Sequence, residues 1–242
     1  MQALARVVQI MAEAVAETAD DRLPHRLCEA FTAALGVRSA AISVMSDLDH
    51  RRLLHAQTSD AAGAEQLQFS LGEGPGLDAF LTGRPVLAGD LSGADARRWP
   101  LFAAGLAAQG LPVRAAFAFP MSVSEVRFGV LGLYQDTPGL LDEETLSAAR
   151  IGVEIAGAAL LKSIGSDESA EPGWLDSPDL DGVEIDQAVG MAMAQLDVDA
   201  QTALARLRAR AFADGRPLGE VARDLIDRRF RFAPEDRDRT ER

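Results

Sequence analysis

A single cysteine, Cys28, stands among the 242 residues, so the chain can form neither an intramolecular disulfide nor a zinc site built from several cysteines. Lysine is equally scarce: Lys162 is the one lysine among 24 basic residues, and all the others are arginine. No apolar run approaches the ~18 residues that span a bilayer. Arg6, Gln9 and Glu13 interrupt the opening segment, where a signal peptide would be continuously apolar. We therefore expect a soluble, cytoplasmic protein with no membrane partner.

Residues that carry catalysis are also few. The three histidines, His25, His50 and His55, have no third ligand type at a spacing that would complete a metal site, so we interpret them as surface residues. Cys28 lies on or near the buried stripe of a predicted helix, where a packing role is favoured over a reactive thiol. The chain contains neither GxSxG nor GxxxxGK[ST], and no serine is paired with a histidine. We predict that the protein is not an enzyme, and we identify no metal site or cofactor motif.

The acidic balance is confined to part of the chain. The formal net charge is −13, from 37 acidic and 24 basic residues. Residues 1–182 hold 25 of the acidic and 13 of the basic side chains, whereas residues 183–232 hold 8 of each. Because nucleic-acid binding replaces counterions with Lys or Arg, this distribution restricts any nucleic-acid surface to the neutral segment.

An acidic segment separates two patterned regions. Residues 163–181 contain six carboxylates, two prolines and no basic residue. Such a segment buries too little apolar surface to offset the entropy lost on ordering it. We therefore predict two domains, 1–162 and 182–232, joined by an acidic linker at 163–181 and followed by a polar tail at 233–242.

The first region changes from helical to strand periodicity and back. The predicted opening helix has an apolar stripe formed by Leu4, Val7, Val8, Met11 and Val15. A second helix over 23–35 would end at Gly36. The further predicted elements are strands at 39–44, 53–57 and 67–71, a short helix at 78–81, a hairpin of 113–119 with 127–135, and a helix at 140–162. This pattern predicts an α+β domain around an antiparallel sheet with flanking helices.

The glycine-rich segment Gly72–Gly76 admits two interpretations. Backbone N–H groups in such a loop can hold a phosphate at a helix N-terminus. Glu73 would repel that phosphate, so turn geometry is the favoured interpretation.

A series of short motifs surrounds this turn. Glu73-Gly74-Pro75 is followed by Asp90-Leu91, by Arg98-Trp99-Pro100, and later by Phe119-Pro120-Met121 and Phe128-Gly129-Val130-Leu131-Gly132-Leu133-Tyr134. Over residues 1–162 this series resembles the GAF domains of bacterial regulators. The resemblance implies an antiparallel sheet with helices on both faces and a pocket on one side, used for small molecules, for dimer packing or for both. Many relatives have Cys where this chain has Gly76, which argues against a thiol sensor in this loop.

The residues that we place near such a pocket are chiefly apolar, as is usual for small-molecule sites. They are Phe69, Leu77, Trp99, Phe102, Phe117 and Phe119. The alternative, favoured by composition alone, is that all six belong to the hydrophobic core. The ligand remains unidentified.

Three amphipathic helical patterns and no strand pattern fill residues 182–232, which predicts an all-α three-helix bundle. We expect Asp199 to cap the second helix and Gly215 to end it, with Phe212 on its apolar face. Its start, IDQAVGMAM at 185–193, and its end, LGEVA at 218–222, resemble the ANTAR domain, an RNA-binding three-helix module. The resemblance implies binding to hairpins in nascent transcripts, which prevents a terminator from forming. Relatives often have Lys at the position of Val189 and Arg at that of Gly182, so two positive charges are missing here.

Arginines make this bundle the basic-rich part of the chain. Arginine donates paired hydrogen bonds to phosphate and stacks on unpaired bases. The eight interspersed carboxylates leave open the alternative of solvated helix faces with i,i+4 ion pairs. The residues that we predict to contact RNA are Gln187, Arg208, Arg216, Arg223, Arg228 and Arg229.

Two functions remain open. The first is a cytoplasmic transcription antitermination regulator, whose first domain senses a small molecule or a partner and whose second domain binds hairpin RNA as a homodimer. The helices at 4–15 and 140–162 are candidate dimer elements, because each has an apolar stripe near a domain end. The alternative is a protein-interaction regulator whose C-terminal bundle docks to a partner protein, through exposed apolar residues such as Met193 or Phe230, and does not bind RNA.

Overall fold

The computed structural model describes residues 2–16, 22–46, 51–123, 126–165 and 180–232. The chain divides into two compact units, one of residues 1–69 and 73–177 and the other of residues 70–72 and 178–242. Most of the predicted linker, the predicted tail and His50 lie outside the described residues. No helix in the described ranges is long and apolar enough to cross a membrane.

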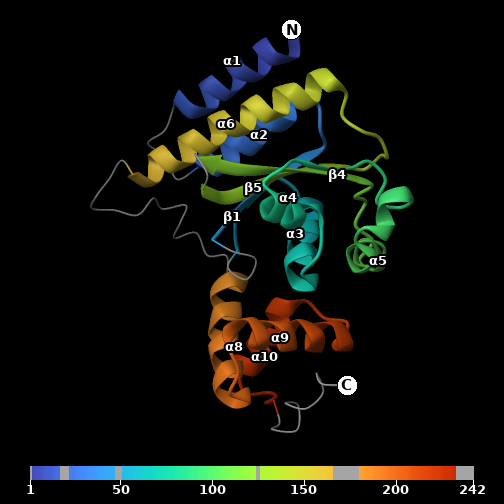
Figure 1. Ribbon diagram of the computed structural model, residues 1–242, viewed down its shortest axis with the longest axis vertical. Helices are drawn as coiled ribbons and strands as arrows, with labels where there is room; N and C mark the ends of the chain where they lie inside the picture. Colours follow the sequence, from blue (N-terminus) through green and yellow to red (C-terminus); the bar gives the residue numbers. More distant parts are fainter. Residues whose placement is uncertain (1, 17–21, 47–50, 124–125, 166–179, 233–242) are drawn as a thin grey trace. The chain divides into compact units, whose positions relative to one another are not determined.

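The first unit is built on a five-stranded antiparallel sheet with the order β2-β1-β5-β4-β3 (Figure 1). Its strands are β1 Ser39–Met45, β2 Arg51–Ala56, β3 Val86–Ala88, β4 Ala115–Val123 and β5 Val126–Gln135. The predicted hairpin is confirmed: β4 pairs with β5 from Ala115 opposite Gln135 to Val123 opposite Val126. The sequence pattern did not indicate the three-residue edge strand β3, which is too short to show a period.

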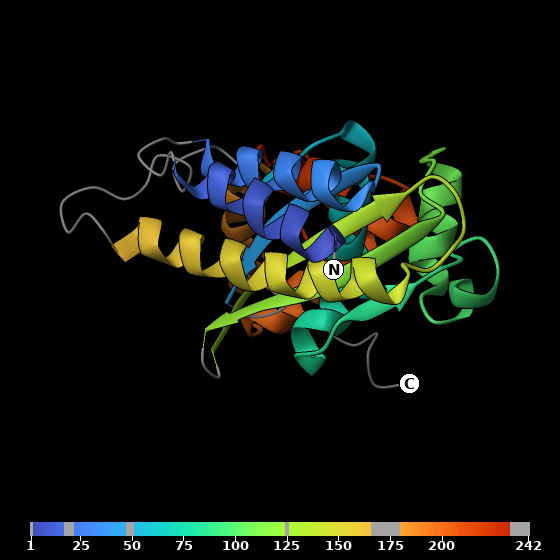
Figure 2. The ribbon, with the colours of Figure 1, turned by 90° about the horizontal axis from the view of Figure 1, so that it is seen from above.

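Helices cover both faces of this sheet. On one face α1 Gln2–Ala16, α2 Leu23–Leu35 and α6 Glu143–Gly165 lie side by side (Figure 2). On the other face lie α3 Ser59–Leu71 and α4 Pro75–Thr82 (Figure 1). A 3-10 turn at Ala94–Arg97 leads into α5 Pro100–Ala108. The predicted end of the second helix is confirmed, because Gly36 caps α2 in the left-handed conformation with φ 68°.

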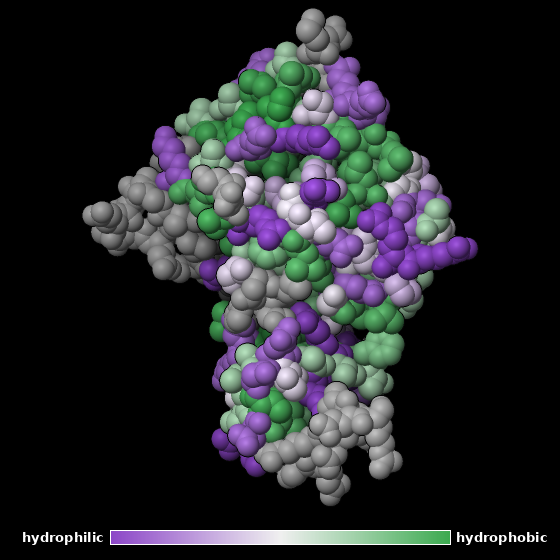
Figure 3. Space-filling model, viewed as in Figure 1, coloured by the Kyte–Doolittle hydropathy of each residue, from purple (hydrophilic) through white to green (hydrophobic). Residues whose placement is uncertain are grey.

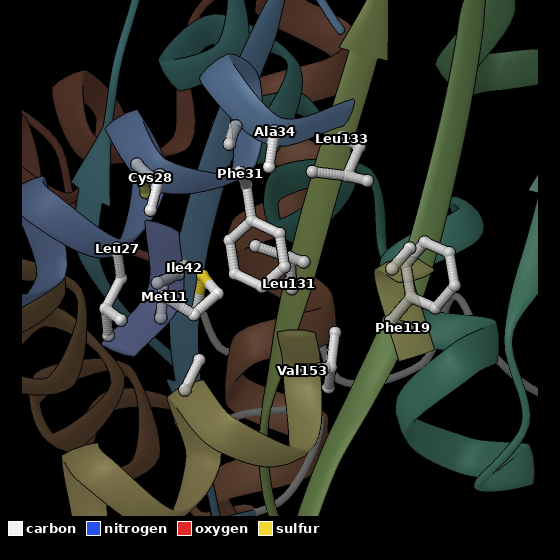
Figure 4. Packing of buried hydrophobic residues seen from close by; sticks show 14 of the residues in the cluster. Met11, Leu27, Cys28, Phe31, Ala34, Ile42, Phe119, Leu131, Leu133 and Val153 are labelled. Atoms are coloured by element: carbon white, nitrogen blue, oxygen red, sulfur yellow. The ribbon is translucent and has the colours of Figure 1, made fainter. Parts of the chain in front are cut away.

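The main hydrophobic core lies between the sheet and the layer of α1, α2 and α6. Alternate residues of each strand enter it, including Phe117 and Phe119 of β4 and Leu131 and Leu133 of β5. Figure 4 shows Phe31 of α2 pointing toward the two leucines. Each such fully buried side chain contributes roughly 1.5–3 kcal/mol relative to an exposed one.

Two local predictions for the first unit are wrong. Residues 67–71 form the last turn of α3 rather than a strand. The Thr58 hydroxyl accepts a hydrogen bond from the N–H of Ala61 at 3.2 Å and so starts the helix, and three alternating pairs are too few to distinguish the two periods. Val8 does not face the core: its side chain is 43% exposed, whereas Val7 and Met11 are fully buried.

The second unit consists, in its described part, of α8 Leu180–Leu196, α9 Ala200–Asp214 and α10 Leu218–Ile226. The predicted caps of α9 are confirmed: Asp199 accepts a hydrogen bond from the N–H of Thr202 at 2.7 Å, and Gly215 adopts φ 64° after the last turn. Ala192, Leu207 and other apolar residues of the three helices are buried. The expectation that Phe212 packs with them is wrong, since it is 62% exposed.

Candidate functional site

The glycine-rich turn before α4 is organised by internal hydrogen bonds. Glu73 Oε1 accepts a hydrogen bond at 2.8 Å from the backbone N–H of Phe102, the third residue of α5. Glu73 thereby satisfies one of the N–H groups that a helix start leaves unpaired. Gly74 has φ 150°, and a Cβ there would lie 2.4 Å from Gln68 Cγ, so both conformation and space require glycine. The turn is therefore explained by its geometry.

The tryptophan of the Arg98-Trp99-Pro100 motif anchors the neighbouring loop. Trp99 is 2% exposed, and its Nε1 donates to Asp78 Oδ2 at 3.0 Å. The Arg98 guanidinium lies 4.1 Å from the centre of the Trp99 ring and donates to the carbonyl of Leu87 at 3.2 Å. The motif therefore connects α4, β3 and α5, and its residues stabilise the frame of the site.

A buried polar cluster occupies the sheet face under α3. Tyr134 of β5 donates its hydroxyl to Glu65 Oε1 at 2.6 Å and accepts from Gln68 Nε2 at 3.0 Å. Glu65 also accepts from the Ser43 hydroxyl at 3.0 Å and forms an ion pair with Arg51 at 3.6 Å. The side chains of Glu65 and Arg51 are each only 7% exposed. A charged pair is tolerated at this depth because several hydrogen bonds surround it.

This cluster extends to the glycine-rich turn. Gln68 Oε1 accepts a hydrogen bond at 2.7 Å from the backbone N–H of Gly76 in the first turn of α4. The Glu65 carboxylate can lie close to the backbone of β5 because residue 132 is glycine: a Cβ at this position would lie 2.7 Å from Glu65 Oε1. The cluster therefore joins β5, α3 and α4 through side chains that leave no room for larger neighbours.

The environment keeps the Tyr134 hydroxyl protonated. Burial raises the pKa of Tyr134 well above its ordinary value, and the negative charge of Glu65 raises that pKa further. The protonated hydroxyl can donate to the Glu65 carboxylate, and the short distance of 2.6 Å is typical of a hydrogen bond to a charged acceptor.

Beside the cluster lies a cavity of only about 10 Å³, lined in part by Ser43, Glu65, Gln68 and Leu77. A cavity needs roughly 10–15 Å³ to hold one water molecule. This cavity therefore has no space for a small-molecule ligand, because the chain's own polar side chains fill the region around it.

Ion pairs hold the side chains of Arg216 and Arg229 in the second unit. Arg216 contacts Asp224 at 2.6 Å and Glu220 at 3.2 Å, while Arg229 contacts Asp224 at 2.7 Å and Asp227 at 3.1 Å. One carboxylate, that of Asp224, therefore holds two guanidinium groups. Hydrogen bonds from Arg216 and then Arg229 lower the pKa of Asp224, and their hydrogen bonds to Asp224 raise the pKa of each arginine.

A comparison with family models identifies both units. The model described as GAF domain matches residues 8–161, more than half of the chain. The chain belongs to the GAF domain family. A second model, described as ANTAR domain, matches residues 181–226, so an ANTAR domain follows the GAF domain. Both are regulatory domains, and together they make a regulator with a sensory domain and an RNA-binding output domain.

A solved GAF-domain structure shows the same fold at low sequence identity. The GAF domain of a phosphoenolpyruvate-protein phosphotransferase from Acinetobacter is 10% identical, covers 69% of this chain and 97% of its own, and has a TM-score of 0.52. The corresponding domain from Coxiella burnetii is 14% identical, with 66% and 95% covered and a TM-score of 0.49. A free methionine-R-sulfoxide reductase from Neisseria meningitidis, solved with its substrate, is 16% identical, with 66% and 89% covered and a TM-score of 0.49. No curated protein matches the chain.

The GAF domain does not bring the six predicted pocket residues together. All six are buried, namely Phe69, Leu77, Trp99, Phe102, Phe117 and Phe119. Phe117 and Phe119 belong to the core between the sheet and α1, α2 and α6, on the face opposite the polar cluster. The other four belong to α3, α4, α5 and the residue before α5, and of these Leu77 borders the small cavity.

Sequence reasoning missed the polar cluster of the GAF domain. In a strand over 67–71 Gln68 would point away from Leu67 and Phe69, toward solvent. In the helix that actually forms, Glu65 and Gln68 are three residues apart and share one face. Two buried-facing polar residues at helical spacing, followed by the lone tyrosine of the chain in β5, are the signal that could have revealed the cluster.

His25, His55 and Cys28 have packing roles in the described structure. His25 and His55 contact each other, with ring centroids 4.8 Å apart, so His25 is half-buried rather than exposed as expected. Burial, followed by the charge of His25, lowers the pKa of His55. Cys28 is fully buried on α2, and burial raises the pKa of its thiol. Among the described residues no cluster of three or more His, Cys, Asp or Glu side chains is suited to a metal ion.

The ANTAR domain exposes part of its predicted RNA surface. Gln187 is exposed on α8, Arg208 is half-buried on α9, and Arg223 pairs with Glu184 at 3.1 Å. Arg228 is exposed after α10, with φ 60°, and has no ion pair with a described residue. The interpretation of i,i+4 pairing therefore holds for Arg216 with Glu220 and for Arg210 with Asp214.

Proposed function

We propose that this chain is a transcription antitermination regulator. Its GAF domain senses a small molecule or a partner, and its ANTAR domain binds hairpin RNA in nascent transcripts, which places its action in the cytoplasm. The observation that carries the proposal is the match of an RNA-binding output domain directly after a sensory domain. The helical bundle supports it, because its last helix and the residues after it present Arg223, Arg228 and Arg229 at the surface.

The exposed aromatic side chain of α9 gives this surface a second type of contact. Phe212 is 62% exposed, so its ring is accessible to a binding partner. Aromatic side chains stack on the unpaired bases of RNA loops, whereas arginines contact phosphates. We assign Phe212 to base stacking and the arginines to the phosphate backbone, with Gln187, Arg208 and Arg216 as further contacts.

The missing cations of α8 set an expectation for affinity. Val189 stands where relatives often have Lys, and α8 contains no basic residue, so this helix contributes no positive charge. Two copies of the domain in one homodimer would double the phosphate contacts to tandem hairpins. We therefore propose that the functional RNA-binding form is a homodimer.

The first helix offers a surface for such a dimer. Ala5, Val8 and Ala12 of α1 are exposed and recur at spacings of three and four residues, so they form a second apolar stripe beside the buried one. Hydrophobic residues reach the surface around α1 in Figure 3. This stripe is the surface on which we expect the two copies to pair.

The test is RNA binding by the purified full-length chain. We expect preference for a tandem-hairpin RNA over a random RNA of equal length, with affinity that falls as salt rises. The variant Arg223→Ala/Arg228→Ala/Arg229→Ala should lose at least tenfold in affinity, whereas Arg84→Ala/Arg97→Ala/Arg114→Ala, with the same charge change in the GAF domain, should not. Equal binding of both RNAs by the unmodified chain would contradict the proposal.

A transcription assay tests antitermination separately. On a template that encodes the tandem hairpins before a terminator, the protein should increase the fraction of full-length transcript. A chain that binds the hairpins without changing this fraction would be an RNA-binding regulator of another kind.

A partner-protein function for the bundle is the second candidate. Met193 and Phe230, proposed from sequence as exposed docking residues, are half-buried, and Phe230 packs edge to face against Phe232 at 5.5 Å. Phe212 of α9 and Val183 of α8, which are 62% and 63% exposed, are the large apolar residues of the described bundle that such a partner would reach. If Phe212→Ala abolishes regulation in cells while RNA affinity is unchanged, the docking function is correct.

A further inference from the structure

A groove of about 530 Å³ lies on the α6 side of the GAF domain. The edge strand β3 pairs only with residues 116–118 of β4, so the rest of that edge of β4 has no neighbouring strand among the described residues. The groove opens there, between α6 and the loop that joins α4 to β3. Its volume is in the range of small-molecule sites, roughly 300–1,000 Å³.

Part of the lining of the groove is apolar. Pro85 and Pro120 are half-buried and contribute ring surface, and Phe119 and Val153 also line it, although they are only 1% and 6% exposed. An apolar body can contact these side chains, while the polar part of the lining is available to a charged end group.

Two arginines of the rim have no partner within the described chain. Arg84 and Arg150 are exposed and form no ion pair or side-chain hydrogen bond with a described residue. Other arginines of the same domain are used internally: Arg51 pairs with Glu65, and Arg98 donates to the carbonyl of Leu87. Guanidinium groups donate paired hydrogen bonds to carboxylates. The rim is therefore suited to one end of an anionic molecule.

Glu154, also on the rim, limits the charge of that molecule. With two arginines and one glutamate the rim carries a formal charge of +1, which matches a monoanion. A doubly charged phosphate would be attracted by the arginines but also repelled by Glu154.

We propose that this groove binds a small organic carboxylate with an aromatic or aliphatic body, which lies on Phe119 and Val153 while its carboxylate contacts Arg84 and Arg150. The cavity beside the polar cluster on the opposite face of the sheet, of about 10 Å³, has no room for such a molecule. A second groove of about 450 Å³, beside α5, also has an apolar lining and two exposed arginines, Arg97 and Arg114. The groove at α6 differs from it in having an acidic rim residue, Glu154, and in being lined by the last helix of the GAF domain.

A carboxylate bound here would act on α6. Arg150, Val153 and Glu154 belong to that helix, whereas Arg84 belongs to the loop before β3. A ligand that contacts both arginines would hold α6 against the edge of the sheet, and α6 is the last helix of the GAF domain before the ANTAR domain. This regulatory consequence rests on the proposed function, whereas the binding itself does not.

The test uses 2-naphthoate as the probe and titrates it into the full-length chain by isothermal calorimetry. Its neutral analogue 2-naphthamide has the same ring system without the charge. We expect Arg84→Ala/Arg150→Ala to weaken naphthoate binding at least tenfold and Glu154→Gln to strengthen it a few-fold, and naphthamide to bind at least tenfold more weakly. The control Arg97→Ala/Arg114→Ala removes the same charge from a second groove, beside α5, and should bind naphthoate like the unmodified chain.

Each other outcome overturns the proposal. No naphthoate binding, unchanged binding by the Arg84/Arg150 variant, loss in the Arg97/Arg114 control, or equal binding of naphthamide would each show that this groove is not a carboxylate site. Circular dichroism must show that all variants are folded. Hairpin-RNA affinity is measured with and without naphthoate. If the chain binds naphthoate but no RNA, the carboxylate site is supported and the proposed RNA-binding function is contradicted. If it binds RNA but no naphthoate, the proposed function is supported and the carboxylate site is contradicted.

Discussion

Glu73 and Phe102 are 29 residues apart in the chain, yet the Glu73 carboxylate caps α5 by accepting the Phe102 backbone N–H at 2.8 Å. The residue that precedes α5, Trp99, makes no side-chain cap hydrogen bond. A distant carboxylate therefore takes the role that a local Ser, Thr, Asp or Asn usually has at a helix start. The Glu-Gly-Pro motif is a structural motif of the GAF domain in this chain, and its glutamate is used for folding.

Replacement of Glu73 should test this role. Glu73→Ala leaves a half-buried N–H without its partner, and we expect a loss of about 1–2 kcal/mol in the free energy of unfolding. Glu73→Gln keeps a carbonyl acceptor and should lose less than half as much. Native-state hydrogen exchange should show the Phe102 amide exchanging faster in Glu73→Ala. Equal loss in both variants would mean that the negative charge, and not the hydrogen bond, is what matters.

Gly74 should tolerate no side chain. Gly74→Ala places a Cβ 2.4 Å from Gln68 Cγ in a backbone conformation that favours glycine, so we expect about 2–4 kcal/mol of destabilisation. Gly110 also has positive φ but has no atom within 4 Å of the position of a Cβ, and Gly110→Ala should cost only about 1–2 kcal/mol. Urea unfolding followed by Trp99 fluorescence, in a Trp174→Phe background, would measure both. A Gly110 variant as unstable as the Gly74 variant would contradict the steric argument.

The features that sequence predicted well are those set by neighbouring residues. Gly36, Asp199 and Gly215 end or begin helices through local backbone chemistry, and all three were predicted. The β4–β5 hairpin joins two strongly patterned strands through a short connection, so its pairing also follows from local sequence.

The features that sequence could not predict depend on distant contacts. The alternation of Phe117 and Phe119 predicts that they share a face, but which helices cover that face is decided by the order of all five strands. Tyr134 meets Glu65 across 69 residues, and the error over 67–71 hid the helix face on which Glu65 lies. Hence the six predicted pocket residues do not line one site in the described domain: Phe119 borders the groove beside α6, and Leu77 borders the small cavity on the other face of the sheet.

Stability should fall at alkaline pH because two buried groups resist ionisation. Burial raises the pKa of the Cys28 thiol and of the Tyr134 hydroxyl above their ordinary values, which are about 8.5 and about 10. The unfolded chain loses these protons first, so the stabilisation is complete below about pH 8.5 and decreases as pH rises. Unfolding free energies measured from pH 7 to pH 11 should decline in two overlapping steps.

Single variants assign the two steps. Cys28→Ala should flatten the decline between pH 8 and pH 10, and Tyr134→Phe should flatten the part above pH 10. Tyr134→Phe should also lower stability by about 1–3 kcal/mol at pH 7, because Glu65 and Gln68 lose their partner. If Cys28→Ala retains the full slope between pH 8 and pH 10, the thiol ionises in the folded state and the argument from burial is wrong.

Asp224 should restrain RNA binding. Its carboxylate holds Arg216 and Arg229, so RNA phosphates must compete with it for both guanidinium groups. We expect Asp224→Asn to increase the affinity for hairpin RNA several-fold and to make its salt dependence steeper. The measurement is a set of filter-binding titrations at several salt concentrations.

A matched variant distinguishes the release of Arg216 and Arg229 from the change in the net charge of the domain. Asp214→Asn removes the same charge from the same domain, but its partner is Arg210, at 2.7 Å. It should change the affinity by less than half as much as Asp224→Asn. Equal gains would show that net charge alone controls binding, and weaker binding by Asp224→Asn would show that Asp224 positions the arginines for RNA.

The exposed stripe of α1 should control dimerisation. Val8→Glu places a charge in the middle of that stripe, where burial against a second copy would leave the carboxylate unpaired, so we expect the homodimer to dissociate. Val123 at the end of β4 is a suitable control, because it is 45% exposed, close to the 43% of Val8, and lies outside the stripe. Light scattering should therefore give a monomer for Val8→Glu and a dimer for Val123→Glu. If Val8→Glu is a monomer, its affinity for tandem hairpins should fall toward that of a single domain. If Val8→Glu is still a dimer, the dimer uses another surface, and the affinity of this variant for tandem hairpins should be unchanged.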